Sequence, residues 1–334
     1  MEALLCPGYA SDGGLVVPEA IPRLSVDDLR SFAGLTYPEV VEKLLRYFVS
    51  TDELSPTELH GLLDGCFERF RRPEVAVMTE KENKRGTVLV GTSGDTGSSA
   101  IQGTVGKERL SAVVLYPRGR VTRVQELQMT TVDSPNVVVC AAEGTSDDID
   151  SALRKVFTDT EFASKRTLLS LNSINVARVL VQIAHFFYGY LILCPRADEE
   201  AVFYVPSGAL GNVTAGYVAC RMGLPVKLVA CVNENDVFHR TLVTGELSLS
   251  KEVVHTYSSA MDIQVPYNIE RLLFFMSHGK GEVVRGIMET FETVGSCFIP
   301  HDILEENKVL STSRANTEET LATMRCVWKE HSHY

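Results

Sequence analysis

The amino-acid sequence predicts an α/β fold made of two parallel-sheet halves that follow a helical N-terminal subdomain. From Thr87 onward, short apolar runs alternate with amphipathic stretches, which is typical of parallel strands joined by helices. A charged loop at residues 196–200 interrupts the alternation, which then resumes and so indicates a second sheet. We therefore divide the chain into residues 1–75, 76–165, 166–310 and 311–334, the last being a polar tail expected to be helical at most.

Three helices are expected in the N-terminal subdomain. Ser25 starts the first as its N-cap, with two aspartates in the first turn. Apolar residues recur at helical spacing between Tyr37 and Val49. Ser55 opens the third helix, because a proline follows it and Glu58 stands three positions later, as in a capping box.

The two halves are expected to contain five strands. TVLVG, LSAVVLYP and NVVVCAA belong to the first half, with helices near residues 125–131 and 147–157. AVFYVP and PVKLVACVN belong to the second half and are separated by a helix that ends at Gly223. The apolar run from Val179 to Cys194 falls short of the ~20 residues of a membrane span, so we expect a core helix there.

Composition excludes some classes of partner. The chain has 334 residues and a net charge of −11, which argues against nucleic-acid binding, because phosphate backbones attract clustered basic residues. No membrane segment is expected. The eight cysteines show no metal-binding spacing and are expected to be buried free thiols of a reducing compartment. A cytoplasmic location follows, and a mitochondrial one stays open because an incomplete N-terminus would lack its transit peptide.

Two glycine-rich turns follow predicted strands, where open parallel sheets bind ligands. The first runs from Gly91 to Ser99, and its hydroxyls and close backbone approach suit a carboxylate or phosphate. The alternative is a tight strand-to-helix turn with a serine N-cap. The second turn, from Pro206 to Asn212, suits a phosphate on backbone amides, although it fits neither a Walker loop nor a dinucleotide fingerprint.

A third set of polar residues comprises the segment SLNSIN together with Arg178 and Gln182. On a helix that begins near Asn175, Arg178 and Gln182 share one face, which predicts a buried polar cluster. The alternative is that Asn172 or Ser173 only caps this helix.

These segments together resemble threonine synthase and its vertebrate threonine synthase-like relatives, a branch of the fold type II pyridoxal 5′-phosphate (PLP) enzymes related in fold to the tryptophan synthase β subunit. The resemblance runs from EALLCPGYASDGGLVVPE to about residue 300. It includes VGTSGDTGSSAI, VQELQMTTV, LNSINVARVLVQ, VPSGALGNVTAGYVA, VNENDVFHR and SAMDIQVPYNIERLLF. Their order and spacing are specific, and QELQMTTV and MDIQVPYN favour the vertebrate threonine synthase-like branch.

The resemblance implies roles for residues of all three groups. The PLP phosphate would be held by Ser207, Gly208, Ala209, Leu210, Gly211 and Asn212. The cofactor and substrate side of the cleft would be lined by Ser93, Gly94, Asp95 and Thr96. Of these, Ser93 and Asp95 would contact the cofactor. A phosphorylated amino acid would be bound by Ser93, Gly94, Thr96, Asn172, Ser173, Asn175 and Arg178. Leu210 stands where family loops often carry an aromatic residue.

The resemblance also implies a reaction. In the family, a lysine holds PLP covalently and moves the α-proton of the substrate. The threonine synthase-like branch implies a phospho-lyase that acts on O-phosphohomoserine or O-phosphothreonine and releases phosphate, ammonia and 2-oxobutanoate. A true threonine synthase, which would add water to give threonine, is the second alternative. A monomer and a homodimer are both compatible with the resemblance.

The family lysine lies in a segment of the form HG-x-T-x-x-FKD, and this chain has no such segment. A few dozen residues are expected to be missing between about Val75 and Met78, so Lys81 and Lys84 come too late to replace the lysine. The N-terminus and the region after Tyr334 are also short of the family pattern. We expect PLP to bind without covalent attachment and activity to be impaired. The explanations are a splice variant or incorrect gene model, a non-catalytic paralogue, or an enzyme that uses another lysine. Nothing in the sequence places Lys107 or Lys155 at the cleft.

Overall fold

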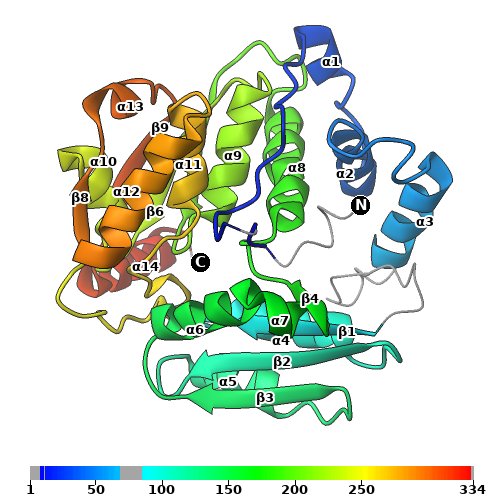
Figure 1. The fold of residues 1–334 in the computed structure, drawn as a ribbon. Coiled ribbons are helices and arrows are strands. Elements are labelled where there is room, and N and C mark those ends of the chain that lie inside the picture. Colours follow the sequence, from blue (N-terminus) through cyan, green and yellow to red (C-terminus); the bar gives the residue numbers. More distant parts are fainter. Residues whose placement is uncertain (1–7, 11, 68–84, 332–334) are drawn as a thin grey trace.

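The computed structural model describes residues 8–10, 12–67 and 85–331. The expected missing segment and the two lysines that follow it, Lys81 and Lys84, lie outside these residues. Two α/β halves and an N-terminal group of helices surround a common centre (Figure 1).

The first half is a four-stranded parallel sheet in the order β3-β2-β1-β4. Its strands are β1 (Gly86–Gly91), β2 (Leu110–Pro117), β3 (Val137–Ala142) and β4 (Thr167–Ser170). Its helices are α4 (Asp95–Thr104), α5 (Arg123–Thr130), α6 (Ser146–Thr158) and α7 (Thr160–Ser164). Alternate residues of β1 face opposite layers: Val88 and Val90 pack with α4 and α5, whereas Leu89 packs with α6.

The second half is a three-stranded parallel sheet in the order β5-β6-β9. Its strands are β5 (Ala201–Pro206), β6 (Val226–Val232) and β9 (Leu310–Arg314), and β7 (Glu246–Ser248) pairs antiparallel with β8 (Ser296–Phe298). Its helices are α8 (Val176–Leu193), α9 (Gly211–Arg221), α10 (Val237–Thr244), α11 (Ile269–Met276), α12 (Gly281–Val294), α13 (His301–Glu305) and α14 (Thr317–His331), with a 3₁₀ turn at Ser259–Met261.

Leu29 of the N-terminal helix α1 (Val26–Arg30) belongs to the apolar core that α8 also enters. Helix α3 (Pro56–Phe67) packs on α2 (Tyr37–Leu45), and α2 packs on α8. The rings of Phe32 and Phe187 lie 5.2 Å apart in this interface. Helix α8 is long and apolar enough by composition to cross a membrane, but half of it is buried inside the protein. It is the core helix that the sequence predicts.

The capping signals in the sequence are confirmed. Ser25 accepts a hydrogen bond from Asp28 N, and the Asp28 carboxylate accepts one in return from Ser25 N. Ser55 and Glu58 exchange the same pair of bonds at the start of α3. Helix α2 ends at Leu45, four residues before the predicted end, because the chain turns there to reach α3.

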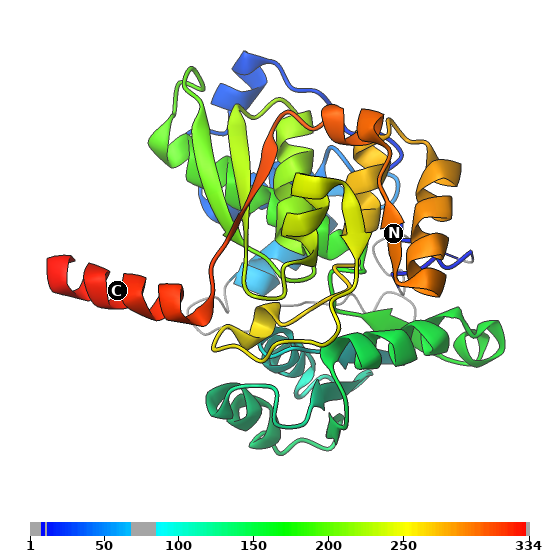
Figure 2. The ribbon, with the colours of Figure 1, turned by 90° about the vertical axis from the view of Figure 1, so that its left-hand side faces the viewer.

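The region around the expected tail differs from the prediction. Residues 311–314 are not helical: they belong to β9, which pairs with β6, so the boundary after residue 310 falls inside a strand. The strand sequence LSTSR is mostly small and polar, so it has no apolar run from which a strand could be predicted. Helix α14 follows, has no buried side chain and extends away from the body (Figure 2). Likewise, β4 follows the boundary at residue 165 but pairs with β1 of the first sheet.

The cysteines are less buried than expected. Cys140 and Cys326 are exposed, and the other five in the described part of the chain are half-buried. Cys140 is exposed because β3 is an edge strand and its outer face has no covering helix.

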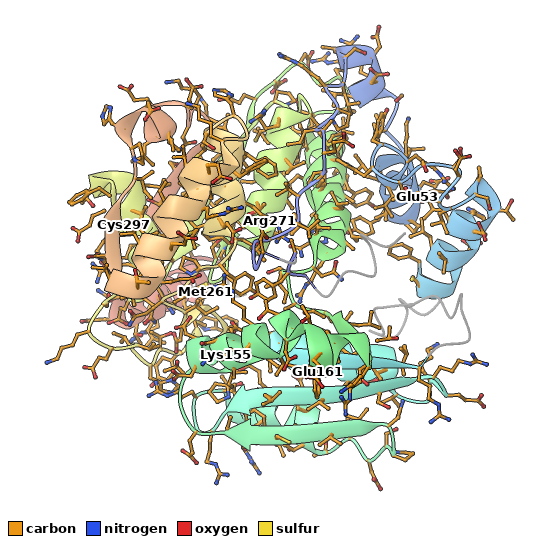
Figure 3. All side chains as sticks on the ribbon, viewed as in Figure 1. Glu53, Lys155, Glu161, Met261, Arg271 and Cys297 are labelled. Atoms are coloured by element: carbon orange, nitrogen blue, oxygen red, sulfur yellow. The ribbon has the colours of Figure 1, made fainter. Side chains whose placement is uncertain are left out.

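One buried guanidinium joins three parts of the fold (Figure 3). Arg271 of α11 is 1% exposed. It donates hydrogen bonds to Val16 O at 2.9 Å, to Ser173 O at 2.6 Å and to Ile174 O at 2.5 Å. It also bonds to Asn268 Oδ1 at 2.6 Å. The N-terminal segment and the turn before α8 are therefore fixed to α11.

Replacing Arg271 should be strongly destabilising. Arg271→Met leaves the carbonyls of Val16, Ser173 and Ile174 buried without this donor. We expect the free energy of unfolding to fall by about 3–5 kcal/mol, measured by urea unfolding.

Arg285→Met is the matched control. Arg285 is 50% exposed and pairs with Asp12 at 3.2 Å. Its loss should change the free energy of unfolding by less than about 1 kcal/mol. Equal losses in the two variants would contradict the central role of Arg271.

Candidate functional site

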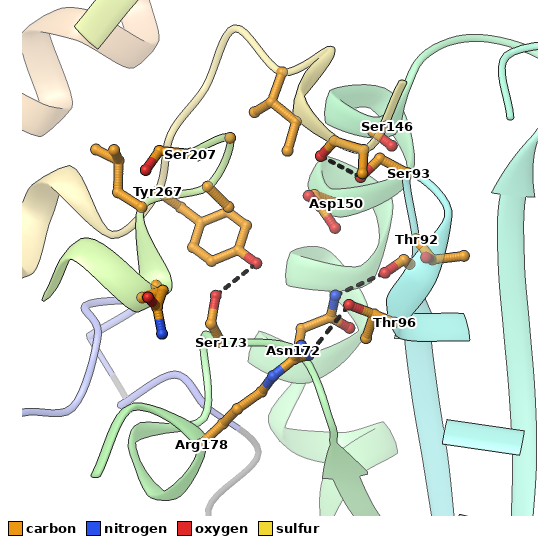
Figure 4. A pocket seen from close by; sticks show the side chains of 18 of the residues that line it. Thr92, Ser93, Thr96, Ser146, Asp150, Asn172, Ser173, Arg178, Ser207 and Tyr267 are labelled. Carbon is orange, nitrogen blue, oxygen red and sulfur yellow. Dashed lines mark hydrogen bonds between the residues drawn. The ribbon is translucent and has the colours of Figure 1, made fainter. Parts of the chain in front are cut away.

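A polar cavity of about 210 Å³ lies where the carboxyl ends of strands from both sheets meet (Figure 4). Gly91 ends β1, Asn172 follows β4 and Pro206 ends β5, and all three line it. The lining residues are Gly91, Thr92, Ser93, Thr96, Ser146, Asp150, Asn172, Ser173, Arg178, Gln182, Pro206, Ser207, Gly208, Ala209, Leu210, Gly211, Asn212, Ala260, Ile263 and Tyr267. Ligands of open α/β sheets bind at this end of the strands.

The loop from Ser207 to Asn212 presents backbone donors to the cavity. Among the described residues, none accepts a hydrogen bond from the N–H groups of residues 208–212. Leu210 has φ +63° as the N-cap of α9, an unusual backbone for a branched residue, and its side chain is buried. Several free amides at the N-terminus of an 11-residue helix make this loop suited to a phosphate.

Glycines are required where the loop meets its neighbours. A Cβ on Gly211 would lie 2.6 Å from Ser173 Cβ, and a Cβ on Gly208 would lie 3.1 Å from both Ala260 O and Met261 Cα. The loop therefore packs directly against the turn before α8 and against the 3₁₀ turn.

The first glycine-rich turn is stabilised by hydrogen bonds between its own residues. Thr92 Oγ1 accepts hydrogen bonds from Gly94 N at 3.0 Å and Gly97 N at 3.1 Å. Gly94, with φ +153°, is the N-cap of α4, so the alternative of a serine cap is wrong. Ser93 faces the cavity and donates a hydrogen bond to Ala260 O at 3.0 Å across the gap between the halves.

The SLNSIN segment forms the floor of the cavity. Asn172 Nδ2 donates to Gly91 O at 2.7 Å, and the Ser173 and Tyr267 hydroxyls lie 3.2 Å apart. Arg178 Nη1 donates to Leu171 O at 2.7 Å and to Thr96 Oγ1 at 3.2 Å. Burial lowers the pKa of Arg178, which nevertheless stays the cationic side chain of the cavity.

The structure brings most of the predicted site residues together. The cavity is lined by Ser93, Thr96, Asn172, Ser173, Arg178, Ser207, Gly208, Ala209, Leu210, Gly211 and Asn212. Gly94, Asp95 and Asn175 do not line it. Asp95 instead accepts a hydrogen bond from Gln125 Nε2 at 2.8 Å. Asn175 caps α8 by accepting from Ala177 N, so the cap is neither Asn172 nor Ser173.

Three polar lining residues were not singled out in the sequence: Ser146, Asp150 and Tyr267. Ser146 directly precedes the helix predicted over residues 147–157 and begins the observed α6, and Asp150 lies four positions later; that spacing was the available signal. Burial, with a smaller effect of Asp147, raises the pKa of Asp150 to about 7. Burial also raises the pKa of Tyr267 to about 12.

None of the described residues that line the cavity is a lysine. Lys107 lies in the turn after α4, and Lys155 lies in the third turn of α6. Neither contributes to the cavity.

Comparisons with known proteins agree with the geometry. Residues 1–67 match the family model described as the threonine synthase N terminus. Human Threonine synthase-like 2 is 40% identical over 372 residues, covering 99% of this chain and 77% of the human protein. Baker's yeast threonine synthase is 32% identical over 388 residues, covering 98% of this chain and 76% of its own length.

Solved structures show the same fold. The PLP-bound threonine synthase of Brucella melitensis superimposes with a TM-score of 0.86 at 31% identity, covering 99% of this chain and 79% of that one. The threonine synthase from yeast gives a TM-score of 0.83 at 31% identity, covering 98% and 76%.

Asp150 should make stability depend on pH. Its pKa is 3.8 when unfolded and about 7 when folded, so the folded state holds more protons between these values. The free energy of unfolding therefore falls as pH rises from about 4 to about 7. Asp150→Asn removes this loss, and we expect it to stabilise the protein by about 1–3 kcal/mol near pH 8.

Thermal unfolding at several pH values tests this. The advantage of Asp150→Asn should vanish near pH 4, where the carboxyl is protonated in the folded state. Asp133→Asn makes the same change in net charge at an exposed position outside the cavity and should have no such effect. A pH-independent difference between Asp150→Asn and the original chain would contradict the assignment.

Proposed function

The chain belongs to the threonine synthase family, and we propose that its cavity binds PLP together with a phosphorylated amino acid. The loop of free backbone amides at the start of α9 carries this proposal, because it faces Arg178 and the SLNSIN turn across one cavity. Two separate sets of anion-binding groups suit a phosphate-bearing cofactor and a phosphate-bearing substrate.

The residues present fit the cofactor that the family implies. The amides of residues 208–212 would hold the phosphate of PLP. At the start of this loop, the Ser207 hydroxyl donates a hydrogen bond to Val205 O. When bound, PLP withdraws electrons from the substrate Cα, which permits loss of the α-proton and departure of phosphate.

The chain's own residues would then bind and orient the substrate. Ser93 and Thr96 lie on the wall formed by β1 and α4. The Thr96 hydroxyl accepts from Arg178 and can still donate to a carboxylate, whereas Ser93 would first have to release Ala260 O. Arg178 is placed to attract the phosphate group, because Thr96 and the Leu171 carbonyl hold its guanidinium at the cavity edge.

We propose a phospho-lyase reaction on O-phosphohomoserine or O-phosphothreonine. In O-phosphothreonine the phosphate is on Cβ, so its carbon–oxygen bond breaks as the α-proton leaves. In O-phosphohomoserine the phosphate is on Cγ, so a β-proton must also leave before that bond breaks, and a proton then returns at Cγ. Either route gives an enamine, from which water releases ammonia. The products are phosphate, ammonia and 2-oxobutanoate. A threonine synthase would instead retain the amino group and form threonine, and the products separate these two functions.

We propose further that this form of the protein is impaired. No lysine lines the cavity among the described residues, and the chain lacks the HG-x-T-x-x-FKD segment. The match to the human relative extends over 372 residues whereas the chain has 334, so at least 38 positions have no counterpart here. Loss of an internal segment accounts for this difference, and a protein that binds PLP without turnover is the alternative function.

Spectroscopy of the protein with PLP tests the cofactor proposal. We expect reversible binding and no covalent pyridoxyl adduct by mass spectrometry after borohydride reduction, because no described residue that lines the cavity is a lysine. Gly211→Ala should weaken PLP binding about tenfold, since its Cβ displaces the loop from Ser173. Gly286→Ala, where a Cβ meets nothing within 4 Å, is the control.

An adduct on a single lysine would contradict the missing-lysine proposal. Equal PLP affinities for Gly211→Ala, Gly286→Ala and the original chain would contradict the phosphate loop.

Product analysis tests the reaction. With O-phosphothreonine or O-phosphohomoserine and PLP, we expect 2-oxobutanoate at a rate at least about 10³-fold below that of a relative that retains the lysine. Threonine as the product would favour a synthase, and turnover equal to that of the relative would contradict impairment.

A further inference from the structure

Helix α6 supplies a wall of the cavity that has no role so far. Ser146 is the first residue of this 13-residue helix, and it lines the cavity on the side of Ser93 and opposite Tyr267 (Figure 4). The N-cap is the preceding residue, Thr145, whose side chain bonds to Asp148. Ser146 therefore brings the start of a helix to the cavity and has no capping role of its own.

The donors at this helix start are unused. Ser146 is 7% exposed, and its hydroxyl has no hydrogen-bond partner among the described residues. The N–H groups of Ser146 and Asp147 also have no acceptor in the described part of the chain, because no helical turn precedes them. A buried hydroxyl without a partner is costly, so these free donors beside one cavity indicate a ligand group that accepts them.

The helix dipole selects an anion as that group. The N-terminal end of an α-helix carries a partial positive charge, which attracts negatively charged groups. The acidic side chains of the first turn are already used elsewhere. Asp147 accepts hydrogen bonds from Gln264 N and Val265 N at 3.0 Å each. Asp148 accepts from the cap residue, Thr145, so the free donors stay available to a ligand.

A nearby charge distinguishes a carboxylate from a phosphate. Asp150 follows Ser146 by four positions, so both side chains lie on one face of α6, and both line the cavity. An ionised Asp150 repels the two charges of a phosphate about twice as strongly as the single charge of a carboxylate. Phosphate groups also have other places around the same cavity, at Arg178 and at the free amides that begin α9.

We propose that the Ser146 hydroxyl and the first N–H groups of α6 bind the carboxylate of the phosphorylated amino acid. This inference rests on the proposed function and places the anionic group of the ligand that neither Arg178 nor the α9 loop takes. Ser93 on the same wall already donates to Ala260 O, whereas the Ser146 hydroxyl is free to donate. The amino group of the ligand makes no contact with α6 in this arrangement and stays free for the cofactor.

Calorimetric titration of the full chain tests this with saturating 4′-deoxypyridoxine 5′-phosphate present. This analogue of PLP has no aldehyde, so it can occupy the phosphate loop without reacting with amines. One ligand is O-phospho-L-threonine, and the other is 1-aminopropan-2-yl phosphate, the same molecule without its carboxylate. We expect Ser146→Ala to weaken binding of the first about tenfold and of the second at most about twofold, because only the first accepts the hydroxyl.

Two controls accompany this variant. Ser151→Ala changes an exposed serine of the same helix that does not line the cavity, and it should alter neither affinity. Unchanged binding of 4′-deoxypyridoxine 5′-phosphate by Ser146→Ala shows that the variant is folded.

Asp150→Asn tests the sign of the charge on the bound group. At pH 8 it removes a negative charge beside the carboxylate, so O-phospho-L-threonine should bind at least about threefold more tightly. Asp133→Asn makes the same change in net charge at an exposed position outside the cavity and should have no effect.

The outcomes are distinct. Selective loss of affinity for O-phospho-L-threonine in Ser146→Ala, with a gain in Asp150→Asn, supports the carboxylate subsite. Equal losses for both ligands, no loss in Ser146→Ala, or no gain in Asp150→Asn would overturn it, while binding of both esters by the original chain leaves the proposed function standing. If the original chain binds neither ester, the substrate part of the proposed function fails and the subsite fails with it.

Discussion

The buried guanidinium of Arg271 is the constraint on which the rest of the site depends. Its bonds to Val16, Ser173 and Ile174 fix the turn before α8, which packs directly against the loop of residues 207–212. Asn268 extends the same network, because it accepts from Arg271 and donates to Ser173 Oγ and Ala209 O. A buried charge is tolerated here because several carbonyl and amide oxygens surround it. The geometry of the cavity floor thus follows from one side chain outside the cavity.

The two sheets end at one cavity, and each half contributes a different kind of polar group to its lining. The second half contributes free backbone donors, which recognise an anion by position rather than by side chain. The first half contributes hydroxyls and a carboxylate from β1, α4 and α6. Tyr267 lies between them, and its hydroxyl reaches Ser173. The cavity therefore combines unpaired backbone donors from one half with hydroxyls and a carboxylate from the other.

Much of this organisation was predictable from local sequence. Capping residues such as Ser25 and Ser55 and the apolar runs of β1, β2, β5 and β6 identify their elements without tertiary information. The glycine-rich turns are recognisable because few other segments need such close backbone approach. Strand β9 was not predictable, since its serines and threonine carry no apolar signal and its pairing with β6 is set by the sheet. Asp95 and Asn175 were predicted to bind a ligand because their side chains are polar. In the structure, the Asp95 side chain bonds to Gln125 and the Asn175 side chain caps α8.

The contacts of the N-terminal segment have a consequence for how the protein is made. Leu15 N bonds to Glu270 and Val16 O to Arg271, each across 255 residues of chain. Contacts between such distant segments form late, because a long loop must close before they contribute. During synthesis, the first half can fold while the cavity floor stays open until α11 has left the ribosome. The turn at Ser173 would remain without its donors for that interval, so the nascent chain should depend on chaperones more than either sheet alone would suggest.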